Sequence, residues 1–132
     1  ESIALYKELV EQPNLLNPAE AYNRLAIMHI EESLVTAKNY ARQAYELQPN
    51  SAKILDTYGH IKALQGDYEG SLKMLRDAFA RDANDPNIRY HLGYTLAELN
   101  RIEEAKKELE YAVNVERPFF RRPQARALLE SL

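Results

Sequence analysis

Apolar residues recur at intervals of three and four positions along the whole chain, and no stretch shows the alternation typical of a β-hairpin. Polar breaks interrupt the pattern, most clearly at residues 48–51, 64–67 and 84–87, where Pro, Gly, Asn and Asp gather. The segments between breaks have an ordinary helix length. The pattern therefore predicts an all-α protein with helices over residues 2–11, 19–31, 34–47, 51–65, 68–82, 86–99, 102–115 and 123–131.

Small and large apolar residues also recur with a period of 34 positions. Small residues return where two helices must approach closely, and larger ones return where space must be filled. A unit of this kind cannot bury its apolar stripe alone and needs a neighbour on each side. The matched positions are Gly59 and Gly93, Ser71 and Ala105, Leu75 and Leu109, and Ala78 and Ala112, with Ala37, Ala41 and Ala44 one period earlier.

These positions resemble the tetratricopeptide repeat, a helix–turn–helix unit of about 34 residues. The resemblance implies a right-handed α-solenoid of stacked helix pairs that forms a single domain over residues 1–132. Its expected parts are a partial preceding helix and linker (1–18), three repeats (19–51, 52–85 and 86–118) and a capping helix (119–132).

Two departures from the repeat pattern stand out. Arg89 occupies the position of an aromatic residue in the third repeat. Residues 2–11 fit the pattern poorly, which indicates an array cut at its N-terminal side, with an apolar face at that end. Homodimerisation through the N-terminal end is therefore left open.

Composition and charge exclude several kinds of chemistry. The chain carries 17 Lys and Arg residues against 20 Asp and Glu residues, and it has no cysteine. Disulfides, thiolate zinc sites and cysteine nucleophiles are thus excluded. No apolar stretch approaches the roughly 20 residues of a membrane-spanning helix, so we expect no direct membrane insertion of this segment. Because the first residue is Glu1, we expect any signal peptide or lipid anchor to lie upstream.

The histidines and acidic residues do not form a recognisable catalytic pattern. His29, His60 and His91 are spaced evenly, but they fall at different positions of the repeat and are expected to point in different directions. Acidic residues cluster near helix starts, where they stabilise the helix dipole. We therefore expect no catalytic residue, no metal site and no cofactor, and hence no enzyme.

The resemblance implies a concave groove built from the first helix of each repeat. Asp56 in this groove would repel a carboxylate, which argues against the carboxylate clamp that some family members use on chaperone tails. A groove of polar and aromatic side chains suits an extended peptide segment or a helix of another protein. The expected partner-binding residues are Asn23, Ile27, Lys53, Asp56, His60, Asn87, Tyr90 and Tyr94.

The C-terminal residues 117–132 are compositionally distinct, with four Arg and one Glu, whereas the rest of the chain is acidic. Basic residues beside aromatics can bind nucleic acid, but four arginines provide only a small basic surface. We therefore expect no nucleic-acid partner. A cap is favoured instead, in which Pro123 starts the last helix and Phe119 or Phe120 docks into the preceding repeat.

Runs such as residues 54–59 and 87–92 are similar to bacterial members of the family, in particular to the repeats of exopolysaccharide-export and exosortase-associated lipoproteins. That similarity implies a non-catalytic periplasmic scaffold in envelope polymer assembly or secretion. Two alternatives stay open. One is a cytoplasmic regulatory adaptor, and the other is a polysaccharide-binding module that stacks sugars on Tyr90 and Tyr94.

Overall fold

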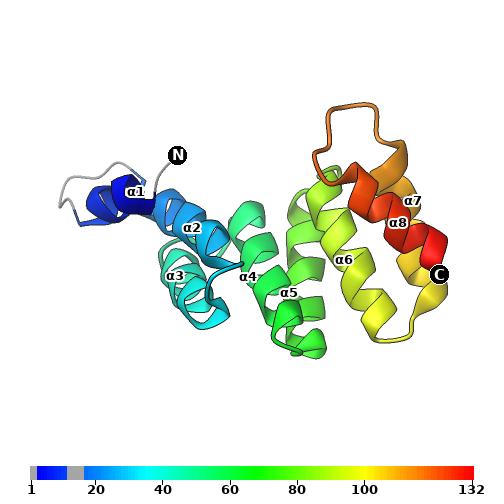
Figure 1. Cartoon of the computed structure of the whole chain (residues 1–132), viewed down its shortest axis with the longest axis horizontal. Helices are drawn as coiled ribbons and strands as arrows, with labels where there is room; N and C mark the ends of the chain where they lie inside the picture. The colour runs from blue at the N-terminus through cyan, green and yellow to red at the C-terminus, as the bar shows by residue number, and fades with distance from the viewer. Residues whose placement is uncertain (1–2, 12–16) are drawn as a thin grey trace.

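The computed structural model describes residues 3–11 and 17–132, and over this part of the chain it contains helices and turns but no strand. The helices follow one another in a row from α1 to α8 (Figure 1). This confirms the all-α fold, and the expected helix ends agree with the observed ones to within one or two residues. The helices are α1 (Ile3–Val10), α2 (Pro18–His29), α3 (Leu34–Leu47), α4 (Ala52–Leu64), α5 (Tyr68–Arg81), α6 (Pro86–Glu98), α7 (Ile102–Asn114) and α8 (Arg122–Ser131).

Successive helices form stacked pairs. The helices α2 and α3, α4 and α5, and α6 and α7 pack most extensively on one another, and each pair packs on the next. In addition, α4 contacts both α2 and α6, so the first helices of the pairs lie side by side. This arrangement is an α-solenoid, and α8 closes it by packing on α7.

Local sequence sets the helix boundaries. Each of the helices α2 to α6 begins after a residue whose side chain accepts a hydrogen bond from the first turn, which satisfies an otherwise unpaired backbone N–H. Gly66 and Asn100, one repeat period apart, follow α4 and α6 with left-handed φ angles of 87° and 59°. The capping residues are Asn17, Ser33, Ser51, Asp67 and Asp85.

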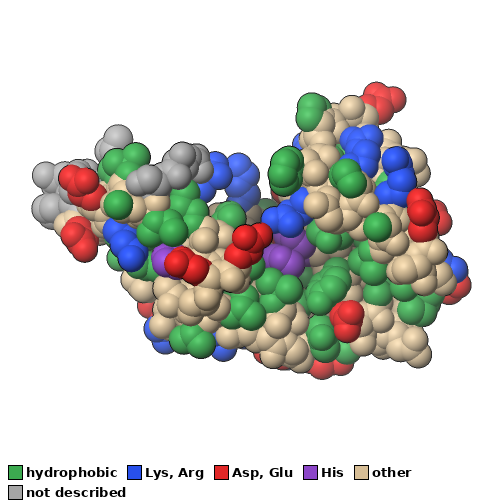
Figure 2. All heavy atoms as spheres, viewed as in Figure 1, with side chains coloured by type: hydrophobic (Ala, Val, Ile, Leu, Met, Phe, Trp, Pro, Cys, Tyr) green, Lys and Arg blue, Asp and Glu red, His purple; other side chains and the backbone are tan. Residues whose placement is uncertain are grey.

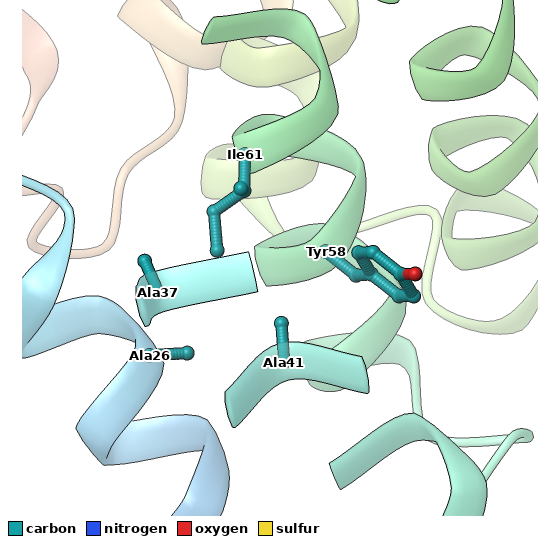
Figure 3. Close-up of a cluster of buried hydrophobic side chains, with 5 residues drawn as sticks. All are labelled: Ala26, Ala37, Ala41, Tyr58 and Ile61. Carbon is teal, nitrogen blue, oxygen red and sulfur yellow. The ribbon is translucent and has the colours of Figure 1, made fainter. Parts of the chain in front are cut away.

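Small side chains allow the pairs to approach, and larger ones fill the seam between them. In the cluster drawn in Figure 3, Ala26 of α2 and Ala37 and Ala41 of α3 face Tyr58 and Ile61 of α4. All five side chains are buried. Because the three alanines leave room on one side, the tyrosine and isoleucine can pack deeply on the other.

Glycine allows the two helices of a pair to pack tightly at two equivalent positions. A Cβ atom on Gly59 would lie 2.9 Å from Cγ of Leu75, and one on Gly93 would lie 2.7 Å from Cγ of Leu109. Both leucines are completely buried. The 34-residue spacing seen in the sequence thus reflects the same close contact in two successive pairs.

The C-terminal segment caps the array. Phe119 is buried and packs with Leu109 and Val113 of α7 and with Ala125 of α8, whereas Phe120 is 91% exposed. The expectation that one of these two phenylalanines docks is therefore met by Phe119. Leu128 and Leu129 complete the apolar contact.

The N-terminal helix α1 packs on α2 but buries none of its residues. Leu5 on this helix remains 52% exposed. Residues 1–2 and 12–16 of the expected N-terminal segment lie outside the described residues. Homodimerisation through this end stays a prediction.

Candidate binding groove

A cavity of about 420 Å³ lies along the first helices of the three pairs, and we call it the groove. Its walls come from α2, α4 and α6 and from Arg121, which precedes α8. Figure 2 shows the hollow, with histidine in its depth and basic side chains at its rim. The residues predicted from the sequence that line it are Asn23, Ile27, Lys53, Asp56, His60 and Asn87.

Tyr90 and Tyr94, predicted to form an aromatic platform, do not line this groove. Tyr90 is half-buried because the segment before α8 folds against it, and its ring meets that of Phe119 edge to face at 6.3 Å between centroids. Tyr94 lies close to Glu98, and burial together with this carboxylate raises the pKa of the Tyr94 phenol. The sequence did not show that the capping segment would occupy the face of Tyr90.

His60 and His91 stack on one another, with 3.9 Å between ring centroids and 17° between ring planes. The expectation that the histidines point in different directions is wrong for these two. In repeat register His91 corresponds to Thr57, and Thr57 and His60 lie one turn apart on the same face of α4. Because α4 and α6 pack side by side, the two rings meet. His29 packs instead on Tyr40.

A buried hydrogen bond holds His91 in place. Its Nδ1 lies 2.7 Å from Oδ1 of Asp56, and both residues are less than 9% exposed. Asp56 belongs to α4 and His91 to α6, so this bond links two helix pairs. Asp56, whose charge was expected to repel a ligand carboxylate, is buried and hydrogen-bonded to His91.

Three buried polar atoms of the groove have no hydrogen-bond partner among the described residues. They are Oδ1 of Asn23, Nδ1 of His60 and Nε2 of His91, which come from α2, α4 and α6. An unsatisfied buried polar atom costs about 1–3 kcal/mol, so such atoms are uncommon in folded proteins. A fourth such atom, Nε2 of His29, belongs to a residue outside the groove, and all four atoms are enclosed by the protein.

His60 is neutral at physiological pH. Burial, the adjacent His91 and the positive charge of Arg121 lower its pKa from 6.5 to about 2. The neutral imidazole can donate or accept a hydrogen bond, depending on which ring nitrogen carries the proton.

The low pKa of His60 predicts a pH-dependent stability. Between pH 6.5 and pH 2 the unfolded chain protonates His60 and the folded protein does not, so this residue lowers the free energy of unfolding as the pH falls. The slope for one proton is about 1.4 kcal/mol per pH unit. We expect urea unfolding of H60Q between pH 6 and pH 4.5 to show a correspondingly smaller loss than wild type. Parallel pH profiles would contradict this prediction.

The sequence interpretation missed two groove residues that define its chemistry. His91 is not among the partner-binding residues expected from the sequence, and Arg121 lies in the tail, outside the repeats. The Arg-rich composition of residues 117–122 indicated a basic segment, but composition does not show that this segment reaches the groove.

Within residues 3–11 and 17–132, no three His, Asp or Glu side chains gather closely enough to hold a metal ion. None of the helices in this part of the chain combines the length and the apolar character needed to cross a bilayer. The absence of a cofactor and of catalytic residues stays a prediction.

Stacked helix pairs with a groove along their first helices define the class of helical-repeat solenoids. The family model described as tetratricopeptide repeat matches residues 62–132, more than half of the chain. The chain belongs to the tetratricopeptide repeat family.

Solved structures with the same fold include bacterial secretion chaperones. The type III secretion translocator chaperone SycD of Yersinia enterocolitica is 17% identical, with a TM-score of 0.74 over 100% of this chain and 98% of its own. MamA is 18% identical, with a TM-score of 0.73 over 98% of this chain and 75% of its own. PcrH, solved with the chaperone-binding region of PopD, is 19% identical, with a TM-score of 0.71 over 85% of this chain and 88% of its own.

Proposed function

We propose that this protein is a non-catalytic scaffold that binds an extended segment of a partner protein in the groove. The observation that carries the proposal is the groove of about 420 Å³ along α2, α4 and α6, whose lining combines apolar and polar side chains. An extended peptide presents backbone N–H and C=O groups along its length, and exposed lining side chains such as Lys53 and Asn87 can form hydrogen bonds with them.

The size and lining of the groove favour the same occupant. A volume of about 420 Å³ admits a short stretch of peptide but not a folded domain. Ile27, Ile30 and Ile54 provide apolar contacts between the polar groups, a combination that suits alternating side chains of a peptide. Structures with this fold include SycD with a peptide of the translocator YopD and PcrH with the chaperone-binding region of PopD.

The cellular setting is proposed from the sequence resemblance alone. It suggests an envelope polysaccharide-export or secretion assembly in the bacterial periplasm, with a cytoplasmic regulatory adaptor as the alternative. Fractionation of the source cells followed by immunoblotting distinguishes the two compartments. Direct polysaccharide binding is less favoured, because Tyr90 is half-buried and packs on Phe119.

The proposal is tested with a matched pair of surface variants. I27E places a charge in the groove at a residue that is 41% exposed, and V35E places the same charge at a residue of α3 that is 67% exposed and lies outside the groove. Peptides enriched from a random 12-residue phage library on the wild type are then measured by fluorescence anisotropy.

We expect I27E to bind the enriched peptides at least tenfold more weakly than wild type, because a charge replaces an apolar contact. V35E should bind them within about twofold of wild type. Equal binding by wild type and I27E would overturn the groove as the binding site.

A further inference from the structure

The acidic groups of the groove are engaged within the protein. Asp56 is hydrogen-bonded to His91 at 2.7 Å. Asp85 caps α6 and forms an ion pair with Arg117 at 3.7 Å. Glu20 lies in the first turn of α2, where the helix dipole stabilises its charge, and it accepts a hydrogen bond of 3.1 Å from the capping side chain. Each of these three acids therefore already has a partner within the protein.

The basic residue Arg121 is not engaged in this way. Among the described residues, no carboxylate lies within ion-pair distance of its guanidinium and no hydrogen bond uses it. Its neighbours in the tail differ, since Arg117 pairs with Asp85 and Arg122 donates to the carbonyl oxygens of Val115 and Arg117. Arg121 is half-buried and lines the groove, so its N–H donors are available to a ligand there.

His60 and Arg121 both line the groove. The positive charge of Arg121 contributes to the lowered pKa of His60. The buried Nδ1 of His60 has no partner among the described residues. A guanidinium and a neutral imidazole therefore line the same groove, and together they carry one positive charge.

Resting on the proposed function, we propose that the part of the groove lined by His60 and Arg121 is a subsite for an acidic side chain, Asp or Glu, of the bound peptide. Arg121 donates hydrogen bonds to the carboxylate, and His60 donates from Nε2, because its Nδ1 is enclosed by the protein. A guanidinium binds a carboxylate through charge-assisted, often bidentate hydrogen bonds, and the single positive charge matches a single carboxylate. Asp56 does not oppose this, because it is buried and bonded to His91.

The first test compares peptide selection on three proteins. Wild type, R121E and the control R126E are each used to enrich a random 12-residue phage library. Arg126 is exposed on α8, lies outside the groove and undergoes the same charge change. We expect wild type and R126E to enrich peptides with an acidic residue at one fixed position, and R121E to enrich a basic residue there. The same acidic residue in the R121E selection would overturn the subsite.

A second test uses one enriched peptide and its Glu→Gln or Asp→Asn version on wild type and R121Q. Removing the acid should weaken binding to wild type about tenfold and binding to R121Q less than about twofold. Equal losses on both proteins would overturn the subsite. The groove proposal would still stand if I27E weakened binding of the same peptides, whereas unchanged binding to I27E would overturn both proposals.

Discussion

Truncation after Pro118 is expected to lower the free energy of unfolding by more than about 3 kcal/mol, because it uncovers the apolar face of α7. In the intact protein Leu109 is completely buried and Val113 is 7% exposed beneath the capping segment. A solenoid without its cap presents this face to water. Urea unfolding of the two proteins, followed by circular dichroism, measures the loss, and an unchanged transition would contradict the role of residues 119–132 as a cap.

A matched pair of point variants isolates the main contact of the cap in a chain of full length. F119A should lose about 3 kcal/mol or more, because a buried aromatic side chain is removed. F120A should change the stability by less than about 0.5 kcal/mol, because Phe120 is almost fully exposed. Similar losses in both variants would show that the packing of the segment in solution differs from that described.

The fold could be predicted from the sequence because the contacts that build it repeat. Gly59 and Leu75 meet within one pair, and Gly93 and Leu109 meet in the same way 34 positions later. Helix boundaries were predictable for a local reason, since capping residues such as Ser51 act within their own first turn. The repeated contacts and the helix caps both involve residues that lie at short or constant separations in the sequence.

The groove could be predicted only in part. Positions on the first helices were assigned correctly as lining residues where neighbouring helices alone form the wall, as for Asn23 and Lys53. The stack of His60 and His91 depends on two different repeat positions that meet across a helix interface, and repeat register alone does not show it. The location of Arg121 in the groove and the partial burial of Tyr90 depend on the path of the capping segment, which no repeat pattern specifies.

Arg89 shows how a departure from the repeat pattern can be accommodated by the same architecture. Its guanidinium carbon lies 4.4 Å from the ring centroid of Phe79 and 3.9 Å from that of Tyr111. The planar guanidinium therefore stacks where an aromatic ring was expected. It also donates to the carbonyl oxygen of Ala83 at 2.8 Å and to Glu108 at 2.9 Å. One side chain thus joins α5, α6 and α7.

Replacing Arg89 by alanine is expected to destabilise the protein by about 3 kcal/mol or more, because Glu108 would be left as an unpaired charge in a largely buried position. The two side chains of this ion pair are only 13% and 12% exposed. R81A is the matched control, since Arg81 and Asp77 form an ion pair at a similar distance of 3.0 Å with side chains that are 39% and 46% exposed. The control should lose less than about 1 kcal/mol.

A double variant separates the unpaired charge from the lost packing. Combining R89M with E108L removes both charges and keeps apolar volume, so its loss of stability should be smaller than that of R89A alone. Urea unfolding at pH 7 measures all the variants under one condition. If the double variant were as unstable as R89A, the stacking of the guanidinium on Phe79 and Tyr111, and not the buried charge of Glu108, would account for the effect.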